Sequence, residues 1–221
     1  LRTRLLNIAN MAFNVLRPRG RQRWDLSVGL LGNGFALTRE TLQAVPYSAS
    51  SVVEDAEYHL LMLEAGLRVT FANGTIVRGA MPVQGKGVTT QRARWEGGRL
   101  RLLRQAAPRL ARRLFRGDWR LWEPLCDLLL LPLAFHALIL LAALLLPFAA
   151  VRLYAVAGLS LLLLHVLAAV RVGGGSWRDL FILATVPFYM AWKVAIVPLL
   201  FKTSSSRAVW VRTQRLAETS S

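Results

Sequence analysis

Residues 85–96 read GKGVTTQRARWE, a glycine-rich stretch followed by helix-forming residues. Thr90 suits the N-cap position, so the sequence predicts a loop up to this residue and a helix after it. In such a helix Gln91, Arg94 and Trp95 stand at positions i, i+3 and i+4 and project from one face. A guanidinium group suits diphosphate oxygens, an amide can bond hydroxyl or phosphate groups, and an indole offers a sugar ring a flat apolar platform. The triplet therefore fits a sugar-nucleotide site, and it equally fits an amphipathic surface helix with one buried tryptophan.

An acidic pair lies upstream, at the start of a second predicted helix. Residues 51–54 read Ser-Val-Val-Glu, which matches a capping box and predicts a helix that begins near Ser51. In the first turn of this helix, the helix dipole favours the ionised form of Asp55. Asp55 is thus a candidate acceptor of protons beside Glu54, but both residues also suit a helix N-terminus as ordinary acids. The buried stripe of this helix is predicted to be Ala56, Leu60, Leu63 and Leu67.

Two other segments carry strand signals. Residues 26–37, LSVGLLGNGFAL, form an apolar run that Gly32-Asn33-Gly34 interrupts. This pattern predicts a buried strand that bends where the backbone comes close to another group, and the alternative is a tight turn or bulge. Residues 68–77, RVTFANGTIV, predict a strand with a turn at Asn73-Gly74. The sequence thus predicts two strands in the same half of the chain as the two helices.

Composition shows that apolar and charged residues are segregated. The chain has 221 residues, 54% of them hydrophobic, yet 28 Lys and Arg against 12 Asp and Glu give a net charge of +16. Most arginines precede residue 125, and long runs of Leu, Ala and Val follow it. This pattern excludes a disordered chain, a disulfide scaffold and a simple soluble domain. Cys126 is the only cysteine, so no intramolecular disulfide can form, and a reduced cytosolic face fits this composition.

Three apolar segments occupy the carboxyl-terminal part. Residues 128–150 are long enough, at about 1.5 Å per residue, to cross a hydrocarbon layer of about 30 Å as one helix. Residues 153–170 predict a second, shorter span. Residues 180–201 contain a lysine and two prolines and fit a span, a re-entrant segment or an interfacial helix. Because the flanking regions are basic, the positive-inside rule favours two crossings with a re-entrant or interfacial third segment.

Ten arginines lie between Gln91 and Arg120, against two acidic residues. A basic patch of this strength can bind nucleic acid. Here it directly precedes an apolar run and is interleaved with apolar side chains, as an interfacial helix requires. We therefore expect membrane lipids and no nucleic acid as its partner, with solvated structural charge as the other alternative. The interleaved apolar residues are Leu100, Leu103, Leu110, Leu114 and Phe115.

The order of these features resembles a known family. Glu54-Asp55 is followed by Gln91-Arg92-Ala93-Arg94-Trp95, with Gln91 standing 36 residues after Asp55, and then by the apolar segments. This arrangement resembles the carboxyl-terminal part of membrane-bound family 2 glycosyltransferases, such as bacterial cellulose and hyaluronan synthases and ceramide glucosyltransferases. Their shared signature is D, D, (E)D, QxxRW. The resemblance covers nearly the whole chain and implies an α/β fold, part of a GT-A-type nucleotide-sugar transferase domain, followed by an α-helical transmembrane region.

The resemblance also implies a role for each matching residue. Asp55 would be the catalytic base that deprotonates the acceptor hydroxyl, with Glu54 as its supporting neighbour. Gln91, Arg94 and Trp95 would fill the QxxRW positions, with Arg94 near the leaving diphosphate and Trp95 at the acceptor sugar. The implied reaction transfers a sugar, with inversion, from a nucleotide-diphosphate donor to a polysaccharide or lipid acceptor.

One part of the family signature is missing. No Asp-x-Asp occurs in this sequence, so the Mg²⁺ or Mn²⁺ that the resemblance implies is expected to bind residues upstream of it. The chain begins at Leu1 without a signal peptide, and we expect it to start inside a larger protein. Without the upstream half, the sugar transferase activity is expected to be absent.

These inferences predict two regions. Residues 1–118 would be the carboxyl-terminal part of a cytosolic catalytic domain with a juxtamembrane basic helix. Residues 119–221 would be a membrane region with two or three hydrophobic helices and a basic tail. The expected location is a bacterial plasma (inner) membrane, which the protein crosses more than once. The competing hypothesis is a non-enzymatic basic membrane anchor or assembly subunit, in which the QxxRW match is fortuitous.

Overall fold

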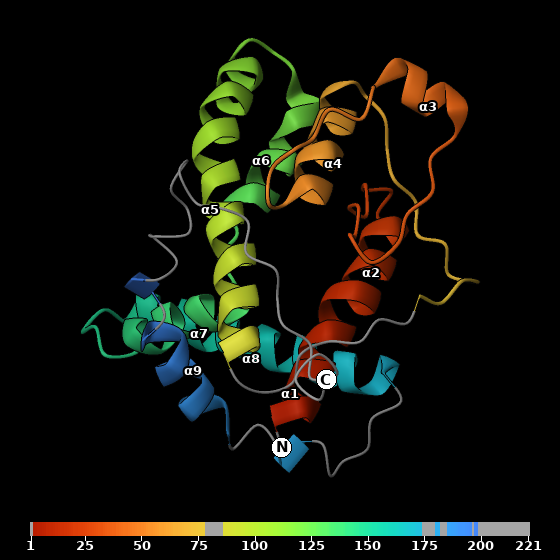
Figure 1. Ribbon diagram of the computed structural model, residues 1–221. Coiled ribbons are helices and arrows are strands. Elements are labelled where there is room, and N and C mark those ends of the chain that lie inside the picture. Colours follow the sequence, from red (N-terminus) through yellow and green to blue (C-terminus); the bar gives the residue numbers. More distant parts are fainter. Residues whose placement is uncertain (1, 78–85, 174–179, 182–184, 196, 199–221) are drawn as a thin grey trace, which may run out of the picture. The chain divides into compact units, whose positions relative to one another are not determined.

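The computed structural model describes residues 2–77, 86–173, 180–181, 185–195 and 197–198. The chain forms two compact units, which are described separately here (Figure 1). Unit 1 consists of residues 1–20 and 131–195, and unit 2 consists of residues 21–130 and 196–221. The predicted boundary after residue 118 falls within unit 2. This boundary was drawn between a catalytic region and a membrane region, and it does not coincide with the division into compact units. The two functional regions stay a prediction.

Unit 1 is built around one long helix, α8. The first helix of the chain and the π-helical turn after it pack on α8, and so does α7. Gly173, just past the end of α8, lies so close to Met11 that a Cβ atom on the glycine would be 2.7 Å from the methionine Cγ. The small core of unit 1 comprises Ile8, Ala12, Ala169 and Val170. The elements are α1 (Arg2–Met11), η1 (Ala12–Leu16), α7 (Leu133–Ala143), α8 (Ala149–Val172) and α9 (Val186–Ala195).

Among the described residues, α8 is the one helix that is long and apolar enough to cross a membrane. Helix α8 has 24 residues. Its most apolar stretch of 18 residues has a mean hydropathy of 2.3, and only 17% of that stretch is buried inside the protein. At about 1.5 Å per residue it extends about 36 Å, which exceeds a hydrocarbon core of about 30 Å. Gly158 on α8 lets α7 approach closely, since a Cβ there would lie 2.9 Å from Leu140 Cδ1.

The prediction that residues 128–150 form one helix is wrong. The chain leaves the helix at Leu130, whose ψ is 123°, and α7 then begins at Leu133 and contains only 11 residues. Pro132 explains the break, because it has no backbone N–H and disfavours helical geometry in the residue before it. The segments Trp119–Leu129 and Leu133–Ala143 reach the length and composition of a span only when taken together as one broken span.

The other membrane predictions have different outcomes. The segment predicted at 153–170 lies within α8, which begins earlier and includes Arg152. Of the segment predicted at 180–201, the ten residues of α9 are helical, while residues 182–184, 196 and 199–201 lie outside the described residues. The predicted basic tail also lies outside them. One helix with the properties of a span is therefore what the described residues show, and the number of crossings stays a prediction.

Unit 2 surrounds a central helix, α4 (Glu54–Glu64), which packs against α5 (Lys86–Phe115) on one side. Two short elements, η2 (Trp119–Leu121) and α6 (Trp122–Leu129), return along α5 (Figure 1). The core between them is apolar and comprises Val53, Leu60, Leu102, Ala106, Leu110, Leu121 and Leu128. The remaining helices are α2 (Arg17–Arg23), which the two units share, and α3 (Arg39–Ala44).

The other side of α4 is covered by loops. Tyr58 and Met62 are buried there against Leu30 and Val45, in a second apolar cluster. Tyr58 is fully buried, and its hydroxyl donates to the carbonyl of Val45 at 2.6 Å. Burial on two sides means that α4 cannot shift without disrupting both clusters, so its first turn has a fixed position within unit 2.

Neither predicted strand is present in the described part of the chain, so the α/β fold is not shown. One backbone hydrogen bond joins the two segments, from the amide of Val28 to the carbonyl of Val69 at 3.0 Å. Side chains take the place of ladder partners, because the amides of Val69 and Phe71 donate to Ser27 Oγ and Gln22 Oε1. The predicted turn at residues 73–74 is confirmed by a hydrogen bond from the amide of Thr75 to the carbonyl of Ala72 at 3.2 Å.

Both helices predicted from the motifs exist, but each has a different start. The Ser51 capping box does not form: Val53 is the N-cap of α4, and the amide of Ser51 donates to Glu57 Oε2 at 3.0 Å instead of to Glu54. Helix α5 begins at Lys86, so Thr90 lies inside it rather than at its N-cap. Extending an existing helix costs much less than nucleating one, which explains why α5 continues upstream of Thr90.

Candidate functional site

Asp55 lies in the first turn of α4 and contacts the glycine-rich loop. Its Oδ2 atom accepts a hydrogen bond from the amide of Gly32 at 2.8 Å, and its Oδ1 atom accepts one from the amide of Ala56 at 2.8 Å. Both oxygens act as acceptors, as those of an ionised carboxylate do. Glu54 beside it is exposed. The carboxylate of Asp55 is therefore held in one orientation by backbone donors, as a fixed proton acceptor requires.

Gly32 is needed for this contact, and Gly34 is needed for a second close approach nearby. A Cβ atom on Gly32 would lie 3.0 Å from Asp55 Oδ2, and one on Gly34 would lie 2.8 Å from Val77 Cγ2. Gly32 and Asn33 form a turn that a hydrogen bond from the amide of Gly34 to the carbonyl of Leu31 closes at 3.0 Å. The alternative prediction of a tight turn is thus confirmed in place of the bent strand, and the backbone does come close to another group, which is Asp55.

An aromatic cluster borders the same turn of α4. Tyr47 lies between Phe35 and Tyr58, with ring centroids 6.5 and 4.7 Å away. Burial raises the pKa of Tyr47 above its usual range, and the negative charges of Glu54 and Asp55 raise it further. Phe35 and Tyr47 remain 42% and 45% exposed. The pair therefore presents partly exposed rings near the carboxylates, a surface on which a sugar ring can stack.

Sequence analysis missed this aromatic pair and also a buried polar contact on the next turn of α4. Ser27 is 3% exposed, and its Oγ atom lies 2.8 Å from His59 Nε2. The amide of Val69 donates to the same Ser27 oxygen at 2.9 Å, and which partner donates between Ser27 and His59 depends on the imidazole tautomer. The only sequence signal was proximity, since Phe35 directly follows the glycines and His59 stands one helical turn after Asp55.

The QxxRW residues lie on α5. Gln91 and Arg94 are half-buried, and Trp95 is 39% exposed. All three lie in one regular helix, so the prediction that they share a face is confirmed.

Gly98 brings this part of α5 against the start of α4. A Cβ atom on Gly98 would lie 2.8 Å from Val53 Cγ1, and Val53 is the N-cap of α4. Gly98 follows Arg94 by four residues, or about 6 Å along the helix axis. Asp55 follows Val53 by two residues in the first turn of α4. The structure therefore brings the start of α4, which carries the acidic motif, against α5 one helical turn after Arg94, and sequence spacing alone does not specify this contact.

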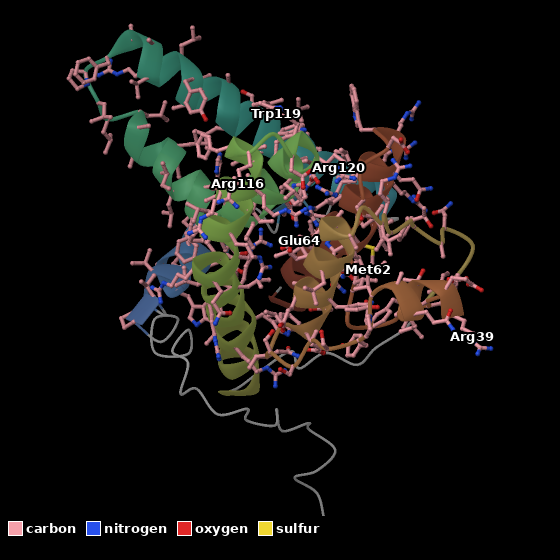
Figure 2. All side chains as sticks on the ribbon, turned by 90° about the horizontal axis from the view of Figure 1, so that it is seen from above. Arg39, Met62, Glu64, Arg116, Trp119 and Arg120 are labelled. Carbon is pink, nitrogen blue, oxygen red and sulfur yellow. The ribbon has the colours of Figure 1, made fainter. Side chains whose placement is uncertain are left out.

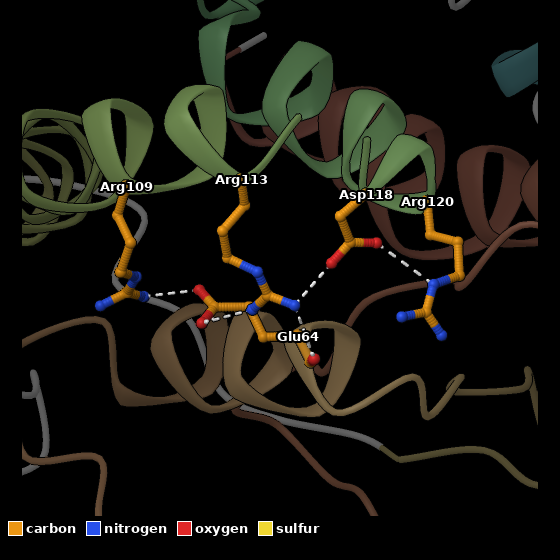
Figure 3. A network of polar contacts seen from close by, with 5 residues as sticks. All are labelled: Glu64, Arg109, Arg113, Asp118 and Arg120. Atoms are coloured by element: carbon orange, nitrogen blue, oxygen red, sulfur yellow. Dashed lines mark hydrogen bonds and ion pairs between the residues drawn. The ribbon is translucent and has the colours of Figure 1, made fainter. Parts of the chain in front are cut away.

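The far end of α4 is fixed to α5 by ion pairs (Figure 3). Glu64 accepts from Arg109 at 2.6 Å, and Arg113 donates to Asp118 at 2.6 Å as well as lying 3.5 Å from Glu64. Asp118 also accepts from Arg120 at 3.2 Å. The hydrogen bond from Arg113 lowers the pKa of Asp118, and the positive charge of Arg120 lowers it further. Since α4 contacts Gly98 at its start and Arg109 and Arg113 at its end, it runs parallel to α5.

The arginine-rich segment thus serves more than one purpose. Arg109, Arg113 and Arg120 form structural ion pairs, and Arg99 donates to the backbone carbonyl of Asp127. The apolar stripe predicted to face lipid is divided, because Leu110 is fully buried against α4 and α6 while Phe115 is 89% exposed. One side of α5 is therefore part of the core of unit 2, and binding of its exposed arginines to lipid stays a prediction.

The residues that the structure describes do not form a divalent-metal site. No group of three or more His, Cys, Asp or Glu side chains gathers in the described parts of the chain. The sequence also has no Asp-x-Asp. Mg²⁺ or Mn²⁺ bound through upstream residues stays a prediction.

Comparison with known proteins gives one match. The family model described as "Glycosyl transferase family group 2" matches residues 21–202, which is most of the chain and includes both motifs. Neither a curated relative nor a solved structure matches. The match to the family model shows that the chain belongs to glycosyl transferase family group 2.

Proposed function

We propose that this chain contains the acceptor-side part of the catalytic site and the membrane region of an inverting glycosyltransferase. The donor would be a nucleotide-diphosphate sugar, and the acceptor a polysaccharide or a lipid. One observation carries the proposal: the Asp55 carboxylate, oriented by the amide of Gly32, lies at the start of α4, where Val53 contacts α5 about one turn from Arg94 and Trp95. Family membership supports sugar transfer as the reaction class.

The proposed reaction needs a base and a charge stabiliser. The acceptor oxygen attacks the anomeric carbon, and its proton passes to the Asp55 carboxylate. The bond between the anomeric carbon and the diphosphate oxygen breaks, and the diphosphate leaves with the electron pair. Arg94 stabilises the charge that grows on the diphosphate, and Gln91 hydrogen-bonds to it or to a sugar hydroxyl. Glu54 is exposed beside the base and adds negative charge that favours transfer of the proton away from the acceptor.

The acceptor sugar would lie on aromatic surfaces at both sides of the base. Trp95 on α5 provides one, and the partly exposed pair of Phe35 and Tyr47 provides another. We further propose that an upstream segment completes an α/β fold of GT-A type and supplies the metal ligands. The fragment is then inactive by itself. The membrane region would place this site on the cytoplasmic side of a bacterial inner membrane, with more than one crossing.

The test compares two motif variants with matched controls in the full-length protein. Arg94→Ala is expected to lower kcat by about 10²-fold or more, since it removes stabilisation of charge that develops in the transition state. Trp95→Ala is expected mainly to raise the KM for the acceptor. The controls are Arg39→Ala on α3 and Trp24→Ala, whose side chain is 81% exposed. Release of nucleoside diphosphate from the donor is the readout.

The competing hypothesis of a non-enzymatic anchor predicts a different result. Arg94→Ala and Trp95→Ala would then behave like the control variants, with no effect on donor turnover, while membrane association persists. That outcome would remove the proposed function.

A further inference from the structure

The short helix α6 is apolar on two opposite faces, and in the described part of the chain only one of them is buried. Leu121, Pro124 and Leu128 are buried on the inner face, where Leu121 and Leu128 belong to the core shared with α4 and α5. The outer face carries apolar residues at intervals of three, four and three positions, which places them on one side of a helix. These residues are Trp119, Trp122, Cys126 and Leu129, with exposed fractions of 71%, 56% and 54% for the two tryptophans and the leucine.

Three exposed arginines lie close to this outer face in the sequence. Arg112 and Arg116 lie on the last turns of α5, and Arg120 lies on η2 between the two tryptophans. Phe115, at the end of α5, is 89% exposed among them. Figure 2 shows Arg116, Trp119 and Arg120 together at the connection between α5 and α6. No acidic residue occurs between Gly97 and Gly117, so the adjoining side of α5 is also positive. We call the four outer-face residues, Phe115 and these three arginines the tip surface.

The chemistry of the tip surface fits a lipid headgroup layer. Tryptophan rings favour the boundary between hydrocarbon and water, and arginines bind phosphate groups there while their stems remain in apolar surroundings. Anionic lipids attract each nearby basic residue by about 1 kcal/mol, which is about fivefold in binding. A soluble anion would engage the arginines but leave the aromatic rings in water.

The position of the tip surface in the chain also points to lipid. The outer face ends at Leu129 and Leu130, which are 54% and 55% exposed, and the sequence continues directly into the apolar residues from 131 onward. We propose that the tip surface docks on an anionic membrane, with the rings of Phe115, Trp119 and Trp122 in the headgroup layer. The proposal goes beyond the proposed function and holds whether or not the chain transfers a sugar.

Docking would have a structural consequence inside unit 2. The inner face of α6 packs on Leu60 and Val53 of α4 through the shared core. A membrane that holds α6 along its surface therefore also fixes the distance of α4 from the lipid. This is the arrangement that a site acting next to a membrane needs.

The test uses Cys126, the only cysteine of the chain, as the attachment point for an environment-sensitive nitrobenzoxadiazole (NBD) label. The protein is reconstituted in nanodiscs of phosphatidylcholine, with or without phosphatidylglycerol. In anionic discs we expect blue-shifted emission and strong quenching by lipids that carry a spin label near the headgroup. The matched control is Trp24→Cys in a Cys126→Ser background, because Trp24 is an 81% exposed aromatic residue of the same unit outside the tip surface. Its label should stay in water.

A charge-reversal variant tests the electrostatic part. Arg112→Glu with Arg116→Glu should abolish most lipid quenching in anionic discs, with helicity by circular dichroism unchanged, since both side chains are exposed. If the labels at positions 126 and 24 gave the same emission and quenching, both typical of water, the proposal would be overturned. A label at Cys126 that is shielded from water but not quenched by lipid would also overturn it, because a protein surface would then cover the face.

Discussion

The contact between Gly98 and Val53 determines how close the acidic motif lies to the QxxRW motif, and a double-mutant cycle measures it. Gly98→Ala should have opposite effects in two backgrounds. In the wild type, the new methyl group would lie 2.8 Å from Val53 Cγ1, well inside ordinary contact distance. Such overpacking costs about 1–3 kcal/mol, whereas replacing a helical glycine by alanine gains about 1 kcal/mol. The net result is a loss of about 0–2 kcal/mol.

Val53→Ala removes the obstacle. Because Val53 is 8% exposed, this change alone should cost about 2 kcal/mol for the lost methyl groups and the cavity that they leave. In this background Gly98→Ala no longer overlaps with a neighbour and partly fills the cavity. It should then stabilise the protein by about 1 kcal/mol, so the coupling energy is about 1–3 kcal/mol.

The assay is thermal unfolding in detergent, followed by circular dichroism at 222 nm, for the wild type, both single variants and the double variant. The predicted order places the double variant above Val53→Ala, and Gly98→Ala below the wild type or equal to it. If Gly98→Ala shifts the midpoint by the same amount in both backgrounds, the two residues do not touch. The geometry that links the two motifs would then be wrong.

Further predictions concern the ion pairs of unit 2. Arg21 lies 2.5 Å from Glu123, and the two side chains are 13% and 14% exposed. Arg21→Ala should lower the free energy of unfolding by about 2–4 kcal/mol, because it leaves a mostly buried carboxylate unpaired. In contrast, Arg68→Ala removes a pair whose side chains are 54% and 85% exposed and should leave the thermal midpoint unchanged within error. Arg113 and Arg120 lower the pKa of Asp118 in the folded protein. The ionised Asp118 carboxylate therefore stabilises the fold above its pKa in the unfolded state, and this stabilisation is lost as the pH falls below about 4. Thermal midpoints between pH 3 and 5 should therefore fall less steeply for Asp118→Asn than for the wild type, and parallel curves would contradict this assignment.

Local signals predicted the helices of the site well. The residues around Asp55 and the QxxRW motif form α4 and α5, and the glycines at 32 and 34 do mark a close approach of the backbone. These features depend on neighbours in the sequence or on the absence of a side chain. The partner of Gly32 could not be predicted, because Asp55 is 23 residues away and only the packed fold brings them together.

The wrong predictions had physical causes. Apolar runs at 26–37 and 68–77 suggested strands, but side chains of Ser27 and Gln22 satisfy amides that a neighbouring strand would otherwise bind. Hydropathy treated residues 128–150 as one span, whereas Pro132 breaks the helix. The ion pairs of Arg109 and Arg113 were not predicted, because sequence does not show which arginines meet Glu64 or Asp118.

The central claim is that Asp55 acts as the base of a sugar transfer, and the transfer rate of Asp55→Asn in the full-length protein tests it most directly. The amide oxygen of asparagine can still accept from Gly32, whereas the bond from the Ala56 amide to Oδ1 is lost and the side chain can no longer take a proton. We expect the rate to fall by about 10²–10⁴-fold and the free energy of unfolding to fall by only about 1 kcal/mol, while Asp25→Asn, at an exposed aspartate, has no effect on the rate. A rate for Asp55→Asn close to that of the wild type would contradict the account.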